Sequence, residues 1–385
     1  MNIIQYTTRF CQLSETFIYG LVCGLQRAEP GTRVLSLERL NVKEYPFDPV
    51  DIHPLATHRL TYKLLQYAPT LQPIIHRFPL NKTGSVHQCL LNYFRSVNAD
   101  VVHVHFATAA IAVADTCHAA KIPLVVSLRG YDASRILKKA RWRWLYRWLF
   151  RKTSAVVVVS SDMRERIKPL VPTHVPIHVI HAGKNPEKYV FKQQLNPVRK
   201  LLSVGRLVEK KGHDDAIRAV HYARSLGADI SLQIIGDGAL KSDLATLIDR
   251  EGLSDHVSLL GALPHNQVIQ AMQEADAVVL ACRTGHDGDM EGIPNVLKEA
   301  QLIGLPVVST NHSGIPDVIP KENHDWLAHE GDWQQLGKLL HTLACTTPHE
   351  LVQKTTLGRE HIVTHFSATE EVRRHLLLYE RIQSG

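Results

Sequence analysis

Residues 101–128, VVHVHFATAAIAVADTCHAAKIPLVVSL, place two short apolar runs on either side of a longer, alanine-rich segment. The runs at 101–106 and 123–128 are dense in Val and Leu, which predicts buried β-strands. The segment 107–120 between them has the length and composition of a helix. A strand, a helix and a second strand in this order predict two parallel strands in a sheet that helices cover on both faces.

The same alternation extends in both directions from this stretch. Residues 1–6 predict a first strand followed by a helix at 14–27, and residues 154–183 predict two more strands with a helix between them. Residues 184–198 contain Pro and Lys and interrupt the pattern, which then restarts and continues to residue 311. Two such arrays predict an α/β protein with two Rossmann-like domains.

The length of 385 residues also favours two domains, each able to bury its own core. We expect an N-terminal domain over residues 1–190 and a C-terminal domain over residues 191–365. Residues 366–385 show the pattern of one amphipathic helix, which could return to the first domain.

The composition is that of a globular protein, with 44% hydrophobic and 21% charged residues. No apolar run approaches the ~18 residues that a membrane-spanning helix needs. The first residues lack the basic start and apolar run of a secretory signal. The six cysteines are scattered without a Cys-x-x-Cys pair, which favours reduced thiols over a disulfide framework. These features predict a cytoplasmic protein.

The charge is divided unevenly along the chain. Residues 1–190 contain 25 Lys and Arg against 12 Asp and Glu, whereas the rest of the chain is net acidic. The stretch 135–152, RILKKARWRWLYRWLFRK, has eight basic residues, no acids and three Trp. We expect this stretch to bind an anionic membrane surface, and so a peripheral location on the inner face of the cytoplasmic membrane. A surface helix that packs its Leu and Trp side on the first domain is the alternative, and no nucleic-acid module accompanies the charge.

Charged side chains follow two predicted strands of the second array. Arg206, Lys210 and Lys211 follow its first strand, and Glu291 lies in the loop after a later strand. Glu299 is eight residues beyond Glu291, inside a predicted helix. Ligands of parallel sheets bind at the carboxyl ends of strands, so we expect these charges to meet one ligand. Cations suit a diphosphate and carboxylates suit hydroxyls, which together indicate a nucleotide-sugar.

The C-terminal half resembles the GT-B glycosyltransferases of family four, the retaining class marked by an E-x7-E motif. The segments that match the family pattern, in order, are SVGRLVEKKG, IIGDGALKSDL, SLLGALP, MEGIPNVLKEAQLIGLPVVST and HSGIPDVI. Within the family, LSETFI, VHFAT with RGYDAS, and GDMEGIP with HSGIP make the chain most similar to exopolysaccharide enzymes of the colanic acid and amylovoran type. The resemblance implies a GT-B fold, in which two Rossmann-like domains face each other across a deep cleft.

The resemblance also implies an activity, namely retaining, metal-independent transfer of a sugar from a nucleotide-diphosphate sugar to a growing, lipid-linked saccharide. Arg206 and Lys211, with Lys210 as the alternative, would neutralise the leaving diphosphate. Glu291 would hold the donor sugar's hydroxyls, and Glu299 the ribose hydroxyls. The implied catalytic residues are Glu291, Arg206 and Lys211. The further donor-binding positions are Gly205, Gly236, Asp237, Leu260, Gly261, Ala262, Gly292, Ile293, Pro294, Asn295 and Val296.

The acceptor side is expected in the first domain. The expected residues there are Ser14, His105, Arg129, Tyr131 and Asp132. The family often has a His at the position of Arg129, and an Arg cannot act as a base at neutral pH but can hold an anion. The first helix also lacks the Gly-Gly loop of many relatives, because Ser14 and Glu15 occupy that region.

We expect neither a cofactor nor a metal ion. The Asp-Gly-Asp sequence at 287–289 resembles the metal site of the other glycosyltransferase fold, but turn chemistry explains it better. His103 and His105 alternate on one strand without an evident third ligand, so packing is favoured over metal binding. A catalytically impaired sugar-nucleotide-binding protein and a GT-B sugar-nucleotide epimerase are the alternative functions.

Overall fold

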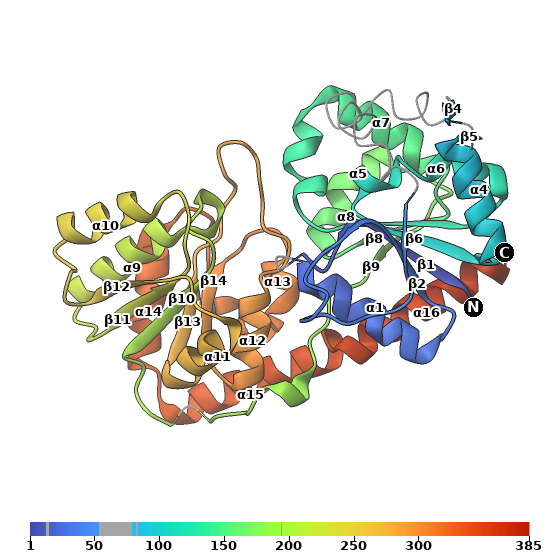
Figure 1. Cartoon of the computed structure of the whole chain (residues 1–385). Helices are drawn as coiled ribbons and strands as arrows, with labels where there is room; N and C mark the ends of the chain where they lie inside the picture. The colour runs from blue at the N-terminus through green and yellow to red at the C-terminus, as the bar shows by residue number, and fades with distance from the viewer. Residues whose placement is uncertain (13–14, 54–78, 82–83, 194, 385) are drawn as a thin grey trace. The chain divides into compact units, whose positions relative to one another are not determined.

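The computed structural model describes residues 1–12, 15–53, 79–81, 84–193 and 195–384. The chain forms two compact units, coloured by residue number in Figure 1. The first unit comprises Met1–Gly183 and Ala368–Gly385, and the second comprises Lys184–Ser367. The boundary therefore falls between residues 183 and 184, and the C-terminal helix belongs to the first unit.

The first unit contains a sheet of seven described strands, all paired in parallel. In spatial order these are β3 (Val50–Ile52), β2 (Arg33–Arg39), β1 (Ile3–Phe10), β6 (Val101–His105), β7 (Leu124–Leu128), β8 (Ala155–Val158) and β9 (Ile177–Val179). The order grows outward in both directions from the middle, so the topological switch point lies between β1 and β6. A short antiparallel pair, β4 (Pro79–Asn81) and β5 (Gly84–Ser85), is separate from this sheet.

Helices cover both faces of this sheet. They are α1 (Thr16–Ala28), α4 (Val86–Ser96), α5 (Ala107–Ala110), α6 (Ala114–Ala120), α7 (Ala140–Phe150), α8 (Ser161–Ile167) and α16 (Ala368–Ser384). The helix predicted over residues 107–120 is divided into α5 and α6. The turn between them lets Ile111 and Val113 both enter the core, which residues two apart on one helix cannot do.

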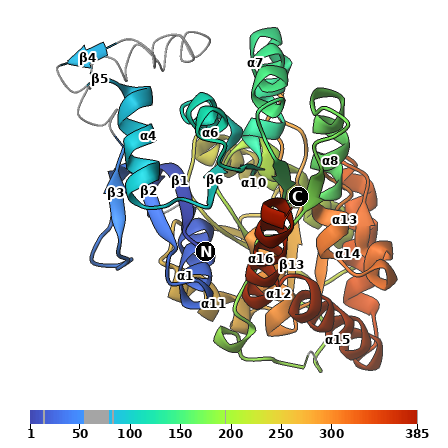
Figure 2. The ribbon, with the colours of Figure 1, turned by 90° about the vertical axis from the view of Figure 1, so that its right-hand side faces the viewer.

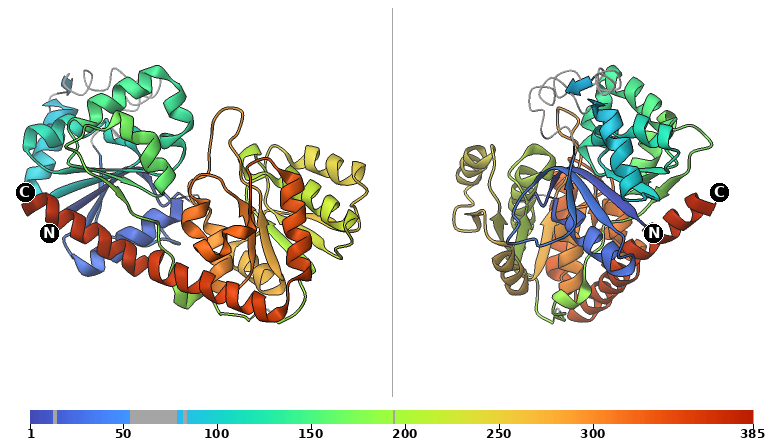
Figure 3. Two further views of the ribbon diagram at one scale, coloured as in Figure 1. Left: turned by 180° about the vertical axis from the view of Figure 1, so that it is seen from behind. Right: turned by 45° about the vertical axis from the view of Figure 1, so that its right-hand side comes forward.

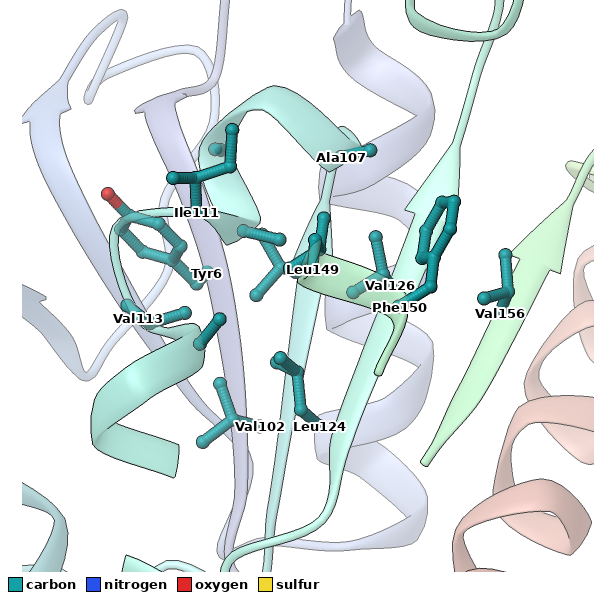
Figure 4. Close-up of a cluster of buried hydrophobic side chains, with 14 of the residues drawn as sticks. Tyr6, Val102, Ala107, Ile111, Val113, Leu124, Val126, Leu149, Phe150 and Val156 are labelled. Atoms are coloured by element: carbon teal, nitrogen blue, oxygen red, sulfur yellow. The ribbon is translucent and has the colours of Figure 1, made fainter. Parts of the chain in front are cut away.

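Successive side chains of a strand point to opposite faces of the sheet, so the first unit has one apolar layer on each face. Val102 and Val126 point to the face covered by α5, α6 and α7, where Figure 4 shows them beside Leu149 and Phe150. Val101 and its neighbours pack on the other face, against α1 and α16. Figures 2 and 3 show α16 alongside α1. Because both faces are covered, the central strands β6, β7 and β8 are buried at every position.

The second unit contains six described strands, which are also parallel. In spatial order these are β12 (Val257–Gly261), β11 (Ser231–Ile235), β10 (Lys200–Val204), β13 (Ala277–Leu280), β14 (Val307–Thr310) and β15 (Leu327–Ala328). Its switch point lies between β10 and β13. The predicted pair of parallel, doubly wound α/β domains is therefore confirmed.

The helices of the second unit form two layers around its sheet (Figure 1). One layer consists of α9 (His213–Ser225), α10 (Lys241–Arg250) and α14 (Trp333–Cys345). The other consists of α11 (His265–Glu274), α12 (Asn295–Ile303), α13 (Ile315–Val318) and α15 (Pro348–His365). The loops that leave β10 and β13 start on either side of the switch point.

Candidate active site

The switch point of the second unit brings the loop after β10 against the loop after β13. The backbone N–H of Arg283 donates to the carbonyl oxygen of Lys210 at 3.1 Å. Gly212 has φ +63°, and a Cβ added there would lie 1.7 Å from the carbonyl oxygen of Ala281. Only glycine permits this approach, which explains the Gly that follows the basic residues in the sequence.

The side chains of Lys211 and Glu291 form an ion pair across these loops. Lys211 Nζ lies 2.8 Å from Glu291 Oε2, and both side chains are mostly buried. Burial alone would raise the pKa of Glu291, but Lys211 and Lys210 outweigh it and lower this pKa to about 2. Glu291 is therefore an ionised carboxylate at neutral pH, able only to accept hydrogen bonds.

The other two predicted cations differ in their pairing. Lys210 Nζ lies 3.0 Å from Asp289 Oδ2 and 3.9 Å from Glu291 Oε2. Arg206 is exposed, and its guanidinium forms no ion pair with any of the described residues. Arg206 is therefore open to an anionic ligand, whereas Lys210 and Lys211 beside it are already paired with carboxylates.

Three predicted glycines lie in a row at the carboxyl ends of neighbouring strands. The N–H of Gly205 donates to the carbonyl of Ile235, and the N–H of Gly236 donates to the carbonyl of Gly261. A Cβ on Gly236 would lie 1.8 Å from the carbonyl oxygen of Gly205. The backbone is therefore compact at these three positions, which carry no side chain.

The remaining predicted positions on this edge are exposed. Leu260 is 40% exposed at the end of β12, and Ala262 follows it on the surface. Asp237 accepts a hydrogen bond from the N–H of Gly238 at 2.8 Å, so its carboxylate shapes the turn after β11. An exposed leucine at the end of an edge strand is a suitable surface for a flat aromatic ring.

Glu291 is followed by the turn that starts α12. Gly292 and Pro294 are buried, Ile293 is half-buried and Asn295 is exposed as the first residue of the helix, with Val296 buried behind it. No described side chain caps this helix, and the N–H of Leu297 donates to the carbonyl of Pro294 at 3.3 Å, so the N–H groups of Asn295 and Val296 stay available among the described residues. These donors and the positive end of the helix dipole favour an anion in front of the turn.

A histidine that was not predicted as a site residue supports Glu291. The N–H of Glu291 donates to His312 Nε2 at 3.2 Å, and His312 Nδ1 lies 2.8 Å from Glu330 Oε2. The HSGIP sequence contributed to the family resemblance, but nothing in it indicated that its histidine contacts the backbone of Glu291.

Glu299 lies in the second turn of α12 and is only 5% exposed. Lys184 Nζ lies 2.6 Å from its Oε1 atom, and the Tyr189 hydroxyl donates to the same atom at 3.4 Å. Both partners were missed by sequence reasoning, because they precede Glu299 by more than 100 residues. The two contacts fix one oxygen of this carboxylate.

The Asp-Gly-Asp sequence is occupied by contacts within the protein. Asp287 Oδ1 accepts a hydrogen bond from the N–H of Asp289 at 2.8 Å, which is turn chemistry, and Asp289 pairs with Lys210. No group of three or more His, Cys, Asp or Glu side chains suited to a metal ion occurs among the residues that the structure describes.

In the first unit, the predicted residues gather at the carboxyl ends of β6 and β7, while Ser14 lies outside the described residues. Asp132 is buried and accepts hydrogen bonds from the N–H groups of Arg129, Gly130 and Ala107 at 2.9–3.1 Å. It therefore holds the loops after both strands together. Tyr131 is 43% exposed and is the most accessible of the predicted acceptor residues that are described.

Arg129 is almost fully buried. Its Nη1 atom lies 3.9 Å from Glu371 Oε1 of α16, and its guanidinium carbon lies 5.0 Å from the centre of the Phe17 ring. Its Nη2 group donates to His105 Nδ1 at 3.2 Å. Burial, followed by the charge of Arg129, lowers the pKa of His105 well below its ordinary value. His105 is thus a neutral, buried ring, and its contact with an acceptor stays a prediction.

A chain of hydrogen bonds continues from His105 into the core. His105 Nε2 donates to Gln5 Oε1, and Gln5 Nε2 donates to the Tyr379 hydroxyl. That hydroxyl donates to His103 Nδ1 at 2.6 Å, and His103 Nε2 donates to Ser127 Oγ at 2.7 Å. The two histidines of β6 therefore have hydrogen-bonding partners within the first unit.

The basic stretch 135–152 forms a short 3₁₀ turn, Arg135–Lys138, and then α7. Leu145, Tyr146, Leu149 and Phe150 of α7 are buried in the core, so this side of the helix packs on the sheet. The exposed basic and aromatic side chains are Arg135, Lys138, Lys139, Arg141, Trp144, Arg147 and Arg151. Trp144 is 59% exposed among these cations. In the described part of the chain, no helix is long and apolar enough to span a bilayer.

Two family models match the two units. Residues 14–188 match the model described as Glycosyltransferase Family 4, and residues 185–348 match the one described as Glycosyl transferases group 1. The crystal structure of Anabaena HepE in complex with UDP and glucose superposes with a TM-score of 0.73 at 16% identity, covering 99% of this chain and 100% of that one. The fold is therefore GT-B.

Two relatives share enough sequence to narrow this class. The amylovoran biosynthesis glycosyltransferase AmsK of Erwinia amylovora is 34% identical over 289 residues, 74% of this chain and 70% of AmsK. WcaL of Escherichia coli K12, assigned to colanic acid biosynthesis, is 31% identical over 273 residues, 70% of this chain and 67% of WcaL. The chain belongs to the family 4 GT-B glycosyltransferases, as its sequence motifs predict.

Proposed function

We propose that this glycosyltransferase moves a sugar from a nucleotide-diphosphate sugar to a growing saccharide of an extracellular or cell-surface polysaccharide, with retention of configuration. The observation that supports it most is the ionised Glu291 beside Lys211, with the exposed Arg206, which pairs with none of the described carboxylates, at the same switch point. The names of AmsK and WcaL support the polysaccharide pathway, and the UDP and glucose bound to HepE support the type of donor.

The charges of the second unit fit the parts of such a donor. Arg206 and the two lysines would neutralise the diphosphate, together with the uncapped start of α12. Glu291 would accept hydrogen bonds from the sugar hydroxyls. Glu299 would accept those of the ribose, and the exposed backbone at Leu260–Ala262 would contact the base.

In the proposed reaction, the site accelerates transfer mainly by stabilising the leaving diphosphate. The bond between the sugar's anomeric carbon and the phosphate oxygen breaks while the acceptor hydroxyl oxygen bonds to the same carbon from the same face. The departing phosphate oxygen takes the acceptor's proton, so no side chain needs to act as a base. Arg206 and Lys211 would stabilise the charge that develops on the diphosphate, without a metal ion. A mechanism without a side-chain base agrees with the first unit, where His105 is buried and neutral and Arg129 pairs with Glu371.

The acceptor is proposed to be lipid-linked and to be met at an anionic membrane surface. The exposed cations of residues 135–152 surround Trp144, while the opposite side of α7 is held in the core. Cations near an anionic bilayer contribute about 1 kcal/mol each, and Trp prefers the interface. We propose that the exposed cations of residues 135–152 and Trp144 hold the enzyme at the inner face of the cytoplasmic membrane.

A thermal-shift screen of nucleotide-sugars, followed by assay of the stabilising donor, tests the proposal. A donor at 100 times its Kd should stabilise the protein by about 2.7 kcal/mol. The anomeric configuration of the product, determined by NMR, should equal that of the donor. An inverted product would refute retention, and absence of stabilisation by any nucleotide-sugar would refute the assignment of the donor site.

A further inference from the structure

We propose that His312 is a positioning residue for Glu291, acting through the backbone N–H of Glu291, and that Glu330 selects the tautomer of His312 that this contact needs. The contact itself is independent of the proposed function, whereas its expected kinetic effect rests on that function. Neither residue is among the positions predicted from the family motifs.

The two ring nitrogens of His312 have different partners on opposite sides. His312 follows β14, and its side chain has no exposed surface. Nδ1 lies 2.8 Å from Glu330 Oε2, and Nε2 lies 3.2 Å from the backbone nitrogen of Glu291. The N–H of Gly314 also donates to the carbonyl of Gly292 at 3.2 Å. Two hydrogen bonds therefore attach the turn at 312–314 to the backbone of residues 291 and 292.

The chemistry of these partners determines the protonation of the ring. A backbone N–H can only donate, so Nε2 of His312 must accept and cannot carry a proton. A carboxylate can only accept, so Nδ1 must carry the proton and donate to Glu330. Without Glu330 the ring is free to move its proton to Nε2, where it would oppose the N–H of Glu291.

Glu330 is itself held in place. The N–H of Thr284, in the loop after β13, donates to Glu330 Oε1. Burial raises the pKa of Glu330, but the hydrogen bonds from His312 and Thr284 outweigh it and lower that pKa below its ordinary value. The carboxylate is therefore ionised at neutral pH and able to accept from His312.

The consequence concerns the direction in which the Glu291 carboxylate points. Glu291 follows a loop that starts at Ala281 and precedes a helix whose first residue is Asn295. The hydrogen bond from its N–H fixes the backbone just where the side chain leaves it. Because a reacting group must be placed within a fraction of an ångström, loss of this bond should reduce the rate even though His312 touches no substrate.

Three substitutions separate positioning from simple packing. His312→Leu removes both ring contacts. The amide oxygen of His312→Gln can occupy the region of Nε2 and accept from Glu291, whereas the shorter His312→Asn reaches only the region of Nδ1. His324→Leu is the matched control for general destabilisation, because among the described residues His324 of the same unit hydrogen-bonds to the carbonyls of Pro316 and Ile319.

The first measurement is hydrogen exchange of the peptide that contains Glu291, in the full chain. His312→Leu should accelerate exchange at this amide roughly tenfold, His312→Gln should restore part of the protection, and His312→Asn should not. Unchanged exchange in His312→Leu, or equal exchange in the Gln and Asn variants, would overturn the proposal. So would equal acceleration in His324→Leu.

The second measurement is the steady-state rate with the nucleotide-sugar found for the wild type. His312→Leu should lower kcat by about tenfold or more with a smaller change in KM, and Gln should recover more of kcat than Asn. Full kcat in His312→Leu would overturn the positioning role. If the wild type transferred no sugar, the proposed function would fail, and hydrogen exchange would still decide whether His312 holds the Glu291 backbone.

Discussion

Lys211 Nζ lies 2.8 Å from Glu291 Oε2, so the cation predicted for the donor's diphosphate and the carboxylate predicted for its sugar neutralise each other. The pair is mostly buried, and each partner stabilises the charged form of the other. A donor that contacts both side chains therefore replaces their ion pair. The affinity for the donor is then the free energy of the new contacts minus that of the ion pair they replace.

This pair predicts a loss of stability in acid. The pKa of Glu291 is lowered to about 2 from an ordinary value of 4.5, so its contribution is complete above pH 4.5 and is lost as the pH falls toward 2. The loss should be about 2–3 kcal/mol. Urea unfolding from pH 6 to pH 2.5 should show a shallower pH dependence in a Glu291→Gln/Lys211→Met double variant. Identical dependence in the two proteins would contradict the prediction.

Arg206→Ala should separate binding from folding. Because Arg206 is exposed and forms no ion pair with the described residues, its removal should change the free energy of unfolding by no more than about 0.5 kcal/mol. If it clamps the diphosphate, kcat/KM for the donor should fall roughly 10- to 100-fold. Arg250→Ala, an exposed arginine of α10, is the matched control. Equal kinetics in the two variants would remove Arg206 from the site.

Chelation should leave the reaction rate unchanged. Asp289 Oδ2 already pairs with Lys210, and Asp287 Oδ1 accepts a hydrogen bond in a turn, so one oxygen of each carboxylate is engaged within the protein. The measurement is the initial rate after dialysis against EDTA, with and without added Mg²⁺ or Mn²⁺. A rate that depends on the added ion, and that is lost in Asp289→Asn, would assign the Asp-Gly-Asp sequence to a metal.

Neutralising the exposed cations of α7 should weaken membrane binding. Arg141→Gln, Arg147→Gln and Arg151→Gln together remove three charges without touching the buried side of the helix. At about 1 kcal/mol per charge, partition into vesicles with anionic lipid should fall roughly 100-fold at low salt. Neutral vesicles and a variant with Arg199, Lys241 and Arg250 replaced are the controls. Equal partition of both variants would exclude a specific role for α7.

A double substitution should show that the buried side chains of Arg129 and Glu371 are energetically coupled. Arg129→Leu leaves the Glu371 carboxylate buried without its cation, which should destabilise the protein by about 3 kcal/mol or more. Arg129→Leu/Glu371→Leu should regain part of that loss, as measured by urea unfolding. Additive losses in the two single variants would show that the side chains act independently.

The sequence predicts the fold well because the signals that determine it are local. Apolar runs and helical spacing identify the strands and helices, and the parallel order follows from their alternation. The break at 111–113 between α5 and α6 was not predicted, because it depends on two side chains entering a core that the sequence does not show. Helices and strands are therefore easier to predict from the sequence than breaks within a helix.

The candidate site is predicted less evenly. Arg206, Lys211 and Glu291 follow strands whose carboxyl ends must meet, so their approach follows from topology. Lys184 and Tyr189 were missed because each contacts Glu299 from more than 100 residues away in the sequence. His312 and Glu330 were missed because one contacts only the backbone N–H of Glu291 and the other contacts His312, and no motif indicates either contact. Packing of His103 and His105 was favoured from the sequence, but the complete burial of His105 depends on α16 covering that face of the sheet.

The position of α16 has a consequence for how the chain is made. The second unit is one continuous segment, whereas the first needs residues 368–384 to complete the layer that contains Tyr379 and Leu378. During translation, every residue of the second unit leaves the ribosome before α16 does. Chains truncated after residue 367 and released from the ribosome should therefore contain a protease-resistant second unit and a protease-sensitive first unit. The half of the enzyme that is synthesised first would be the half that folds last.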